Sequence, residues 1–213
     1  MSNTSLVGKW VVFIAAILCI SAAESPKTIL FFGDSLTAGY GLSVEQAFPA
    51  LIEKQLQAKG ITVKAINAGL SGETSAGGLA RIDWVLRQPV DVFVLELGAN
   101  DGLRGLPVEQ TRQNLQTIID KVRQRNPAVT IVLTGMMVPP NMGPDYTAAF
   151  KRIYPDLSKS NRVKLMPFLL ADVAGHEELN QADGIHPTAE GHRIVARKLG
   201  KIIEELLTSK SNN

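Results

Sequence analysis

The sequence is poor in cysteine, with Cys19 as its single example among 213 residues. One cysteine forms no internal disulfide, which excludes the small secreted scaffolds that depend on disulfide cross-links. A chain of this length buries a core that needs no such cross-link. We therefore expect one globular domain that is stabilised by its core alone.

Long apolar runs are also missing. The longest one spans residues 10–20 and falls short of the ~20 residues that cross a bilayer. Lys9 precedes this run and small residues follow it up to Ala23, which is the order of a secretory signal peptide. Leu18 stands before Cys19 where a lipoprotein signal has a small residue. We expect a signal peptide over residues 1–23, a mature domain over residues 24–213 without a membrane span, and a periplasmic or secreted location.

The chain has no excess of charge of either sign. Removing Lys9 with the signal peptide leaves 21 of the 22 basic residues against 20 acidic ones, a formal charge of +1. Nucleic-acid binding depends on a basic face that contacts phosphates, so this balance argues against it. The sequence also contains no charge block, low-complexity tract or internal repeat, and it implies no partner protein.

The glycine-rich stretch "TILFFGDSLTAGYG", residues 28–41, lacks the common nucleotide-binding motifs. Gly33, Gly39 and Gly41 do not have the spacing of a dinucleotide fingerprint. Five residues separate Gly33 from Gly39 and no lysine follows, which excludes a phosphate loop. The Gly-x-Ser-x-Gly nucleophile elbow fails around Ser35 as well. What remains is a serine at the end of an apolar strand.

The segments that are present predict an α/β fold. Apolar runs predict strands at residues 28–32, 61–67, 90–97, 130–135 and 163–166, with helical patterns between them. Residues 108–125 and 194–206 show the helical period best. Strands that alternate with helices indicate a parallel sheet covered on both faces, a three-layer α/β/α sandwich. Five such strands most often take the flavodoxin-like order 2-1-3-4-5, which brings the loops after the first and third strands together.

Ser35 becomes a nucleophile only if a base takes its proton, and the chain has three histidines. His176 lies in a polar segment and His192 inside the last predicted helix, so surface or packing roles suit both. His186 lies in the loop "QADGIHPT", three residues after Asp183. Asp183 can accept from the Nδ1–H of His186, which leaves Nε2 free to face a serine hydroxyl. Taken alone, this spacing is more often that of a turn aspartate and a histidine at the start of a helix.

Two further loops offer donors for an oxyanion. Asn100 follows the third predicted strand in "LELGANDGLRG", where its side-chain NH₂ is either an oxyanion donor or ordinary turn chemistry. Gly72, in "NAGLSGETSAGG", offers a backbone N–H that no side chain shields. The methionines of "GMMVPPNMGPDY", after the fourth strand, form either an adaptable acyl groove or a surface loop.

The segments "GDSLTAGYG", "SGETSAGG", "LGANDGLRG" and "DGIHPT" together resemble the SGNH, or GDSL, hydrolases in content and order. The chain is most similar to the bacterial periplasmic arylesterase branch, which also contains acyl-CoA thioesterases and lysophospholipases. The resemblance implies that Ser35 is the nucleophile, His186 the base and Asp183 its orienting group. It also implies an oxyanion hole formed by the Ser35 amide, Gly72 and Asn100. The chemistry needs no metal or organic cofactor.

The resemblance implies a serine esterase that cleaves aryl esters, short- to medium-chain acyl esters, thioesters and lysophospholipids. The expected partner is therefore a small ester or lipid substrate. Two alternatives stay open: a carbohydrate O-deacetylase with the same triad, and a carbohydrate- or lipid-binding module that has lost the chemistry. The complete set of Ser35, Asn100, Asp183 and His186 argues against the binding module.

Overall fold

A computed structural model of the protein describes residues 25–210, so the predicted signal peptide lies outside the described residues. Within them the strands form one five-stranded sheet in the order β2-β1-β3-β4-β5, with every pairing parallel. This confirms the predicted fold class and strand order. The strands are β1 (Lys27–Gly33), β2 (Val63–Gly69), β3 (Val92–Glu96), β4 (Thr130–Thr134) and β5 (Lys164–Met166). Their ends differ from the predicted ones by two residues at most.

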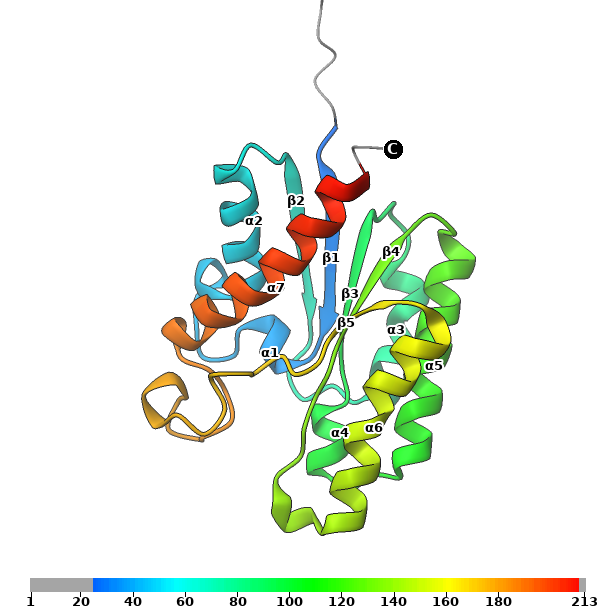
Figure 1. The fold of residues 1–213 in the computed structure, drawn as a ribbon, viewed down its shortest axis with the longest axis vertical. Helices are drawn as coiled ribbons and strands as arrows, with labels where there is room; N and C mark the ends of the chain where they lie inside the picture. Colours follow the sequence, from blue (N-terminus) through cyan, green and yellow to red (C-terminus); the bar gives the residue numbers. More distant parts are fainter. Residues whose placement is uncertain (1–24, 211–213) are drawn as a thin grey trace, which may run out of the picture.

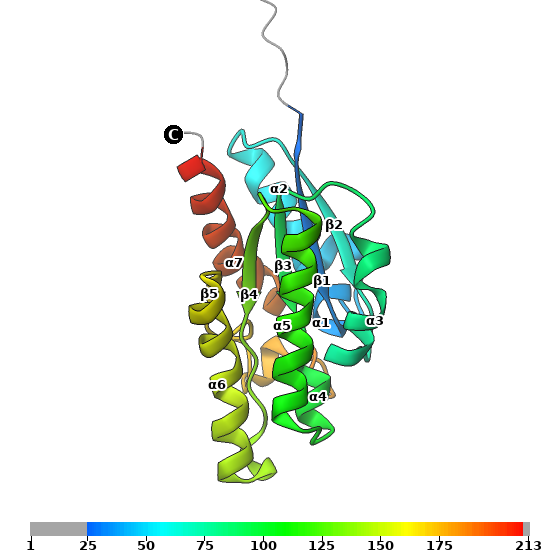
Figure 2. The same cartoon turned by 90° about the vertical axis from the view of Figure 1, so that its right-hand side faces the viewer.

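Helices cover both faces of the sheet (Figure 1). The helix α2 packs against α7 on one face, while α3, α5 and α6 pack in a row on the other, and Figure 2 shows the sheet between them. The helices are α1 (Ser35–Ala38), α2 (Phe48–Ala58), α3 (Ser75–Val85), α4 (Ala99–Leu103), α5 (Val108–Arg125), α6 (Pro144–Asn161) and α7 (Ala189–Lys210). Short 3₁₀ turns lie at Val44–Gln46, Pro140–Met142 and Glu177–Leu179. The molecule is the expected three-layer sandwich.

The core lies on both faces of the two central strands. From Ile29 to Phe32 in β1 and from Val92 to Leu95 in β3 the side chains are buried, as a parallel sheet covered on both faces requires. The apolar stripes predicted for residues 108–125 and 194–206 face this core. Their fully buried members are Leu115, Ile118, Ile119, Val122, Val195, Leu199 and Ile203.

The register brings three strand ends to one edge of the sheet. Gly33 at the end of β1 pairs with Gly69 of β2 on one side and with Glu96 of β3 on the other. The loops that follow these strands therefore meet at the carboxyl edge. Both described ends of the chain lie at the opposite, amino edge (Figure 1). Between residues 25 and 210, none of the helices combines the length and the apolar character needed to cross a bilayer.

Candidate active site

Ser35 is the first residue of the single-turn helix α1, directly beyond β1. Asp34 caps this turn, because its Oδ1 accepts a hydrogen bond of 3.0 Å from the Leu36 amide. Gly33 has no room for a side chain, since a Cβ there would clash with Thr37 Oγ1 and with the Glu96 carboxyl. Each residue of Gly33-Asp34-Ser35 thus has its own structural role. Gly33 fits where a side chain has no room, Asp34 caps the helix, and Ser35 places a hydroxyl at the carboxyl edge.

His186 connects Ser35 to Asp183. The Nε2 atom of His186 lies 2.8 Å from Ser35 Oγ, and its Nδ1 atom lies 2.6 Å from Asp183 Oδ2. Asp183 Oδ1 accepts from the backbone amides of Ile185 and His186, at 2.9 and 3.0 Å. The loop folds back on itself through these two bonds, so a separation of three residues is enough to orient the ring. The sequence predicted this local arrangement, and the structure brings it to Ser35.

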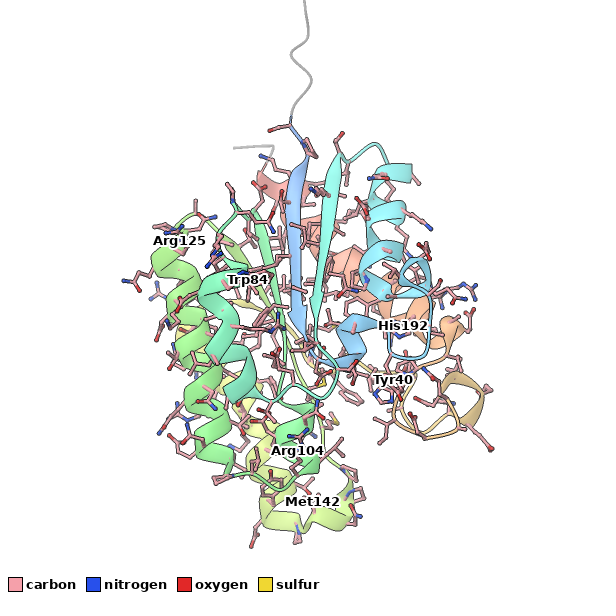
Figure 3. All side chains as sticks on the ribbon, turned by 180° about the vertical axis from the view of Figure 1, so that it is seen from behind. Tyr40, Trp84, Arg104, Arg125, Met142 and His192 are labelled. Atoms are coloured by element: carbon pink, nitrogen blue, oxygen red, sulfur yellow. The ribbon has the colours of Figure 1, made fainter. Side chains whose placement is uncertain are left out.

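The carboxyl group of Asp183 stays ionised. Its hydrogen bond with the His186 ring, helped by the backbone bonds from His186 and Ile185, lowers its pKa to about 2. A ring contact and a loop contact hold the histidine in place. The Tyr40 ring lies 4.5 Å from the His186 ring, centroid to centroid, and Gln181 Nε2 donates to Tyr40 O at 2.7 Å. Tyr40 lies at the carboxyl end of the sheet, as does Arg104 (Figure 3).

The backbone amides of Ser35 and Gly72, both at this edge, donate to no acceptor among the described residues. Gly72 has a φ of +79°, a conformation that favours glycine. Arg104 Nη2 donates to the Gly72 carbonyl at 2.9 Å and fixes the peptide from the α4 side. Unoccupied amides are what an oxyanion hole needs before substrate arrives.

Asn100 lies at the same edge with its side-chain amide already engaged. Its Nδ2 donates to Asp34 Oδ2 at 3.1 Å and to the Glu73 carbonyl at 3.0 Å. Both neighbours are acceptors, so the NH₂ group must face them, and both of its hydrogens are used. To donate to an oxyanion, Asn100 shares or exchanges one of these bonds, a contact that tightens only with substrate present.

An ion pair between the buried Glu73 and the partly buried Arg81 supports the loop that carries Gly72. Arg81 of α3 donates to Glu73 Oε1 at 2.6 Å and to the Ala68 carbonyl at 2.8 Å. The Glu73 side chain is 3% exposed, and Arg81 stacks 4.2 Å above the Phe32 ring. The pair ties α3 to the ends of β1 and β2, and it therefore fixes the Glu73 carbonyl that Asn100 contacts.

Sequence reasoning left four of these residues without a role: Asp34, Glu73, Arg81 and Glu96. For Glu96 a signal exists, because it is one carboxyl group in the otherwise apolar strand "VFVLEL". Such a residue requires partners if it is buried. For Glu73 and Arg81 the spacing carries little information, since their contacts depend on how the 70–74 loop folds over α3.

The other two histidines have the surface and packing roles expected of them. His176 is exposed and lies 3.7 Å from Glu178. His192 is buried, accepts from the Phe48 amide at 3.1 Å and stacks on the Phe48 ring. Neither lies in the hydrogen-bonded chain that contains Ser35.

The methionine-rich loop after β4 is only partly available to a ligand. Met136 is buried in the core and the end of Met142 packs against Gly105. Met137 is 44% exposed. Met142 is half-buried, so Met137 is the most exposed of the three methionines in this loop.

Comparisons with known proteins agree with this geometry. Residues 31–194 match the GDSL-like lipase/acylhydrolase family. The esterase TesA of Pseudomonas aeruginosa is 40% identical over 193 residues, which cover 90% of this chain and 95% of that protein. The Escherichia coli K12 protein named thioesterase 1/protease 1/lysophospholipase L1 is 38% identical over 213 residues, covering 99% of this chain and 100% of that one.

Solved structures show the same fold. The psychrotrophic esterase EstA from Pseudoalteromonas sp., in a structure described as inhibited by monoethylphosphonate, has a TM-score of 0.80 and 35% identity. The match covers 85% of this chain and 99% of that chain. The chain therefore belongs to the GDSL-like lipase/acylhydrolase family and is a carboxylic ester hydrolase.

Proposed function

We propose that the protein is an exported serine esterase in which Ser35 is the nucleophile, His186 the base and Asp183 the group that orients the base. The observation that carries this proposal is the unbroken hydrogen-bonded chain from Ser35 Oγ through the His186 ring to the Asp183 carboxylate. This arrangement meets the geometric requirement for a catalytic triad. The pKa of Asp183, lowered to about 2, keeps the orienting group charged at neutral pH.

In the proposed reaction, Ser35 Oγ attacks the carbonyl carbon of an ester or thioester while its proton passes to His186 Nε2. The oxyanion that forms is held by the Ser35 and Gly72 amides and by the NH₂ group of Asn100. His186 then gives its proton to the leaving alcohol or thiol as the carbon–oxygen or carbon–sulfur bond breaks. Water, deprotonated by the same histidine, hydrolyses the acyl-enzyme and restores Ser35.

The surroundings of the triad support an apolar acyl group. Exposed large hydrophobic side chains on the segments beyond the carboxyl edge include Tyr40, Leu103, Met137 and Ile185. Tyr40 follows α1, Leu103 belongs to α4, Met137 lies in the loop after β4, and Ile185 lies in the loop that carries His186. Aryl esters and short- to medium-chain acyl esters suit these surroundings, and lysophospholipids present the same acyl ester. Because coenzyme A thioesters are cytoplasmic, an exported enzyme meets oxygen esters first.

The names of the relatives support the same range of substrates. One relative is named an esterase, and another carries the names thioesterase, protease and lysophospholipase together. The signal peptide predicted over residues 1–23 supports export.

A chain-length series tests the proposal. Turnover of p-nitrophenyl esters from acetyl to dodecanoyl, and of a lysophosphatidylcholine, is measured with the mature protein and with Ser35→Ala. We expect a maximum between butanoyl and decanoyl and no turnover by the variant. Ser160→Ala, a serine on the distant helix α6, is the matched control and keeps full activity. Activity restricted to acetyl esters would favour the O-deacetylase instead, and no Ser35-dependent turnover of any ester would contradict the proposal.

A further inference from the structure

Glu96 is a carboxyl group buried directly beneath the Ser35 turn. It is the last residue of β3, it pairs with Gly33 of β1, and its exposed fraction is 0%. Every other residue of β3 is apolar and buried. A carboxyl group at such a position costs stability unless its oxygens find partners, so its contacts indicate what it does.

The two oxygens of Glu96 have different surroundings. Oε2 accepts three hydrogen bonds from the Ser35 turn: from the Asp34 amide at 3.1 Å, the Thr37 amide at 3.2 Å and Thr37 Oγ1 at 2.7 Å. Oε1 is buried and receives no hydrogen bond from any donor within residues 25–210. The ionisable group that interacts with the Glu96 carboxyl is that of Asp34, whose own amide donates to Oε2.

Two carboxylates cannot both be charged in a buried contact, and a carboxyl facing a carboxylate is favourable only when a proton lies between them. Three donors on Oε2 make it the carbonyl-like oxygen. The proton then belongs on Oε1, where it also gives this oxygen the partner that it otherwise lacks.

We propose that Glu96 is a positioning residue that works in its protonated form. Its Oε2 holds the 34–37 turn, and its Oε1–H donates to the Asp34 carboxylate. Asp34 in turn accepts from the Leu36 amide and from Asn100 Nδ2, at 3.0 and 3.1 Å. The neutral acid thereby fixes Ser35 and Asn100 relative to each other. This inference rests on the roles proposed above for those two residues.

The electrostatics of the pair agree with this arrangement. Burial and the neighbouring Asp34 raise the pKa of Glu96 well above its ordinary value. Burial raises the pKa of Asp34 to about 6, while hydrogen bonds from Leu36, Glu96 and Asn100 and the charge on His186 oppose the rise. Both shifts favour a protonated carboxyl in this pair, and the hydrogen bonds that both Asp34 oxygens accept place the proton on Glu96.

The other ionisable groups around the pair do not supply a counter-charge to Glu96. The buried Tyr154 of α6 donates to the Leu97 carbonyl at 3.1 Å. Arg81 of α3 is committed to Glu73, and Asp101 of α4 accepts from Ser75 and Thr111. His186 faces Asp34 from the 183–188 loop.

Replacing Glu96 by glutamine distinguishes a protonated Glu96 from an ionised one. The amide of Glu96→Gln keeps one acceptor oxygen for the three donors and adds an N–H toward Asp34, so it imitates the protonated acid. We expect kcat to stay within about threefold of wild type, because the three donors to Oε2 and the Asp34 carboxylate all keep a partner. Asp101→Asn is the matched control: Oδ2 of Asp101 accepts from the Ser75 amide and Oδ1 from the Ser75 and Thr111 hydroxyls, so the NH₂ group replaces an acceptor that two hydroxyls use and should destabilise the protein.

A second variant tests whether Glu96 positions the turn at all. Glu96→Met keeps the volume and removes every polar contact, and we expect kcat to fall by about 10- to 100-fold with KM unchanged, the effect of a small misplacement of reacting groups. If this variant does not fold, Thr37→Val replaces it, since it removes one donor to Oε2 and should lower kcat severalfold with KM unchanged. An unchanged kcat in whichever variant folds would overturn the positioning role.

Infrared spectroscopy tests the protonation state independently of activity. At pH 8 the wild-type protein should show the C=O stretch of a protonated carboxylic acid, and Glu96→Gln should lack it. Absence of that band in the wild type, or a kcat for Glu96→Gln as low as that of Glu96→Met, would overturn the neutral acid. Failure of the proposed function is recognised separately, because Ser35→Ala would then keep the wild-type esterase rate while the infrared result stands.

Discussion

At the scale of single residues, Asp34 connects parts of the site that lie far apart in the sequence. One of its oxygens caps α1 at Leu36 and the other accepts from Asn100, at a sequence separation of 66 residues. The proposed nucleophile, Ser35, and a proposed oxyanion donor, Asn100, are thus held by the same carboxylate. Its closeness to Ser35 in the sequence does not reveal the contact with Asn100, which depends on β1 and β3 being neighbours.

Asn100→Ala removes a proposed oxyanion donor and also the bond to Asp34. We expect kcat to fall by roughly 10² to 10³ with little change in KM, the usual cost of one such donor. Both constants are measured on p-nitrophenyl butanoate. Asn126→Ala, at the amino edge where Asn126 Nδ2 donates to the Val90 carbonyl, is the control and should keep wild-type kcat. An effect on KM alone would mean that Asn100 only shapes the pocket.

Asp183→Asn should place the His186 ring in the wrong tautomer. Asp183 Oδ1 faces two backbone amides, so the NH₂ group of the variant must face Nδ1 and donate to it. The ring proton then lies on Nε2, which can no longer accept from Ser35. The equivalent change in the catalytic triad of a serine protease lowers kcat by about 10⁴.

We expect a smaller loss here, of about 10² to 10³, because the Asp183 side chain is 37% exposed and water partly replaces it. His186→Ala should be more damaging, since it removes the base itself. Measuring kcat for both variants between pH 6 and 9 shows which substitution lowers activity more. If Asp183→Asn kept the wild-type kcat while His186→Ala was inactive, the catalytic group would be a Ser35–His186 dyad without Asp183.

The residues that sequence reasoning identified are those whose partners are local or whose position follows from a strand end. Asp183 and His186 contact each other within one loop, so their spacing already predicts the bond. Glu96 was missed because its partners are 59 and 62 residues away and because its protonation depends on burial. A strand pattern shows which face is apolar, but it does not show which carboxyl group lies beneath a turn.

At the scale of secondary-structure elements, the fold followed from the sequence because alternating apolar strands and amphipathic helices allow few arrangements. All five strands were predicted, and the stripes on α5 and α7 face the core as expected. The loops were predicted less well. The segment after β4 buries Met136 instead of exposing it, since Gly135 bonds to the end of β5 and draws the chain back toward the sheet.

His192 joins the start of α2 to α7, and it makes stability depend on pH. Its Nδ1 accepts from the Phe48 amide, so the ring must be neutral there. Burial, with a smaller effect of the charge on His186, lowers its pKa from 6.5 to about 4. Between these pH values the unfolded chain binds the proton and the folded one does not, so stability falls as pH decreases from 6.5 to 4.

His192→Phe keeps the stacking on Phe48 but leaves the Phe48 amide without an acceptor. We expect the free energy of unfolding at pH 8 to fall by about 1–3 kcal/mol, with kcat unchanged. The difference from wild type should shrink between pH 6.5 and 4.5, because the variant lacks the titrating ring. Urea unfolding at pH 8, 6 and 5 measures this. A difference that stays constant over this range would show that His192 does not titrate on unfolding.

At the scale of the whole molecule, the candidate site and the two ends of the described residues, 25 and 210, lie at opposite edges of one sheet (Figure 1). Cleavage after Ala23 would leave three residues before β1 begins at Lys27, so the leader can be removed without disturbing the sheet. We expect protein exported by a bacterial host to begin at Glu24. Its intact mass gives the start directly, and a periplasmic product that retains Met1 would contradict the signal peptide.

The assignment of Ser35 as the nucleophile is tested most directly by locating a covalent adduct. The mature protein is treated with a fluorophosphonate, and the labelled peptide is identified by mass spectrometry. We predict one adduct per chain, on Ser35, with labelling abolished in Ser35→Ala and slowed by at least about 10²-fold in His186→Ala because the base is gone. An adduct on another residue, or equal labelling of Ser35→Ala, would contradict the assignment.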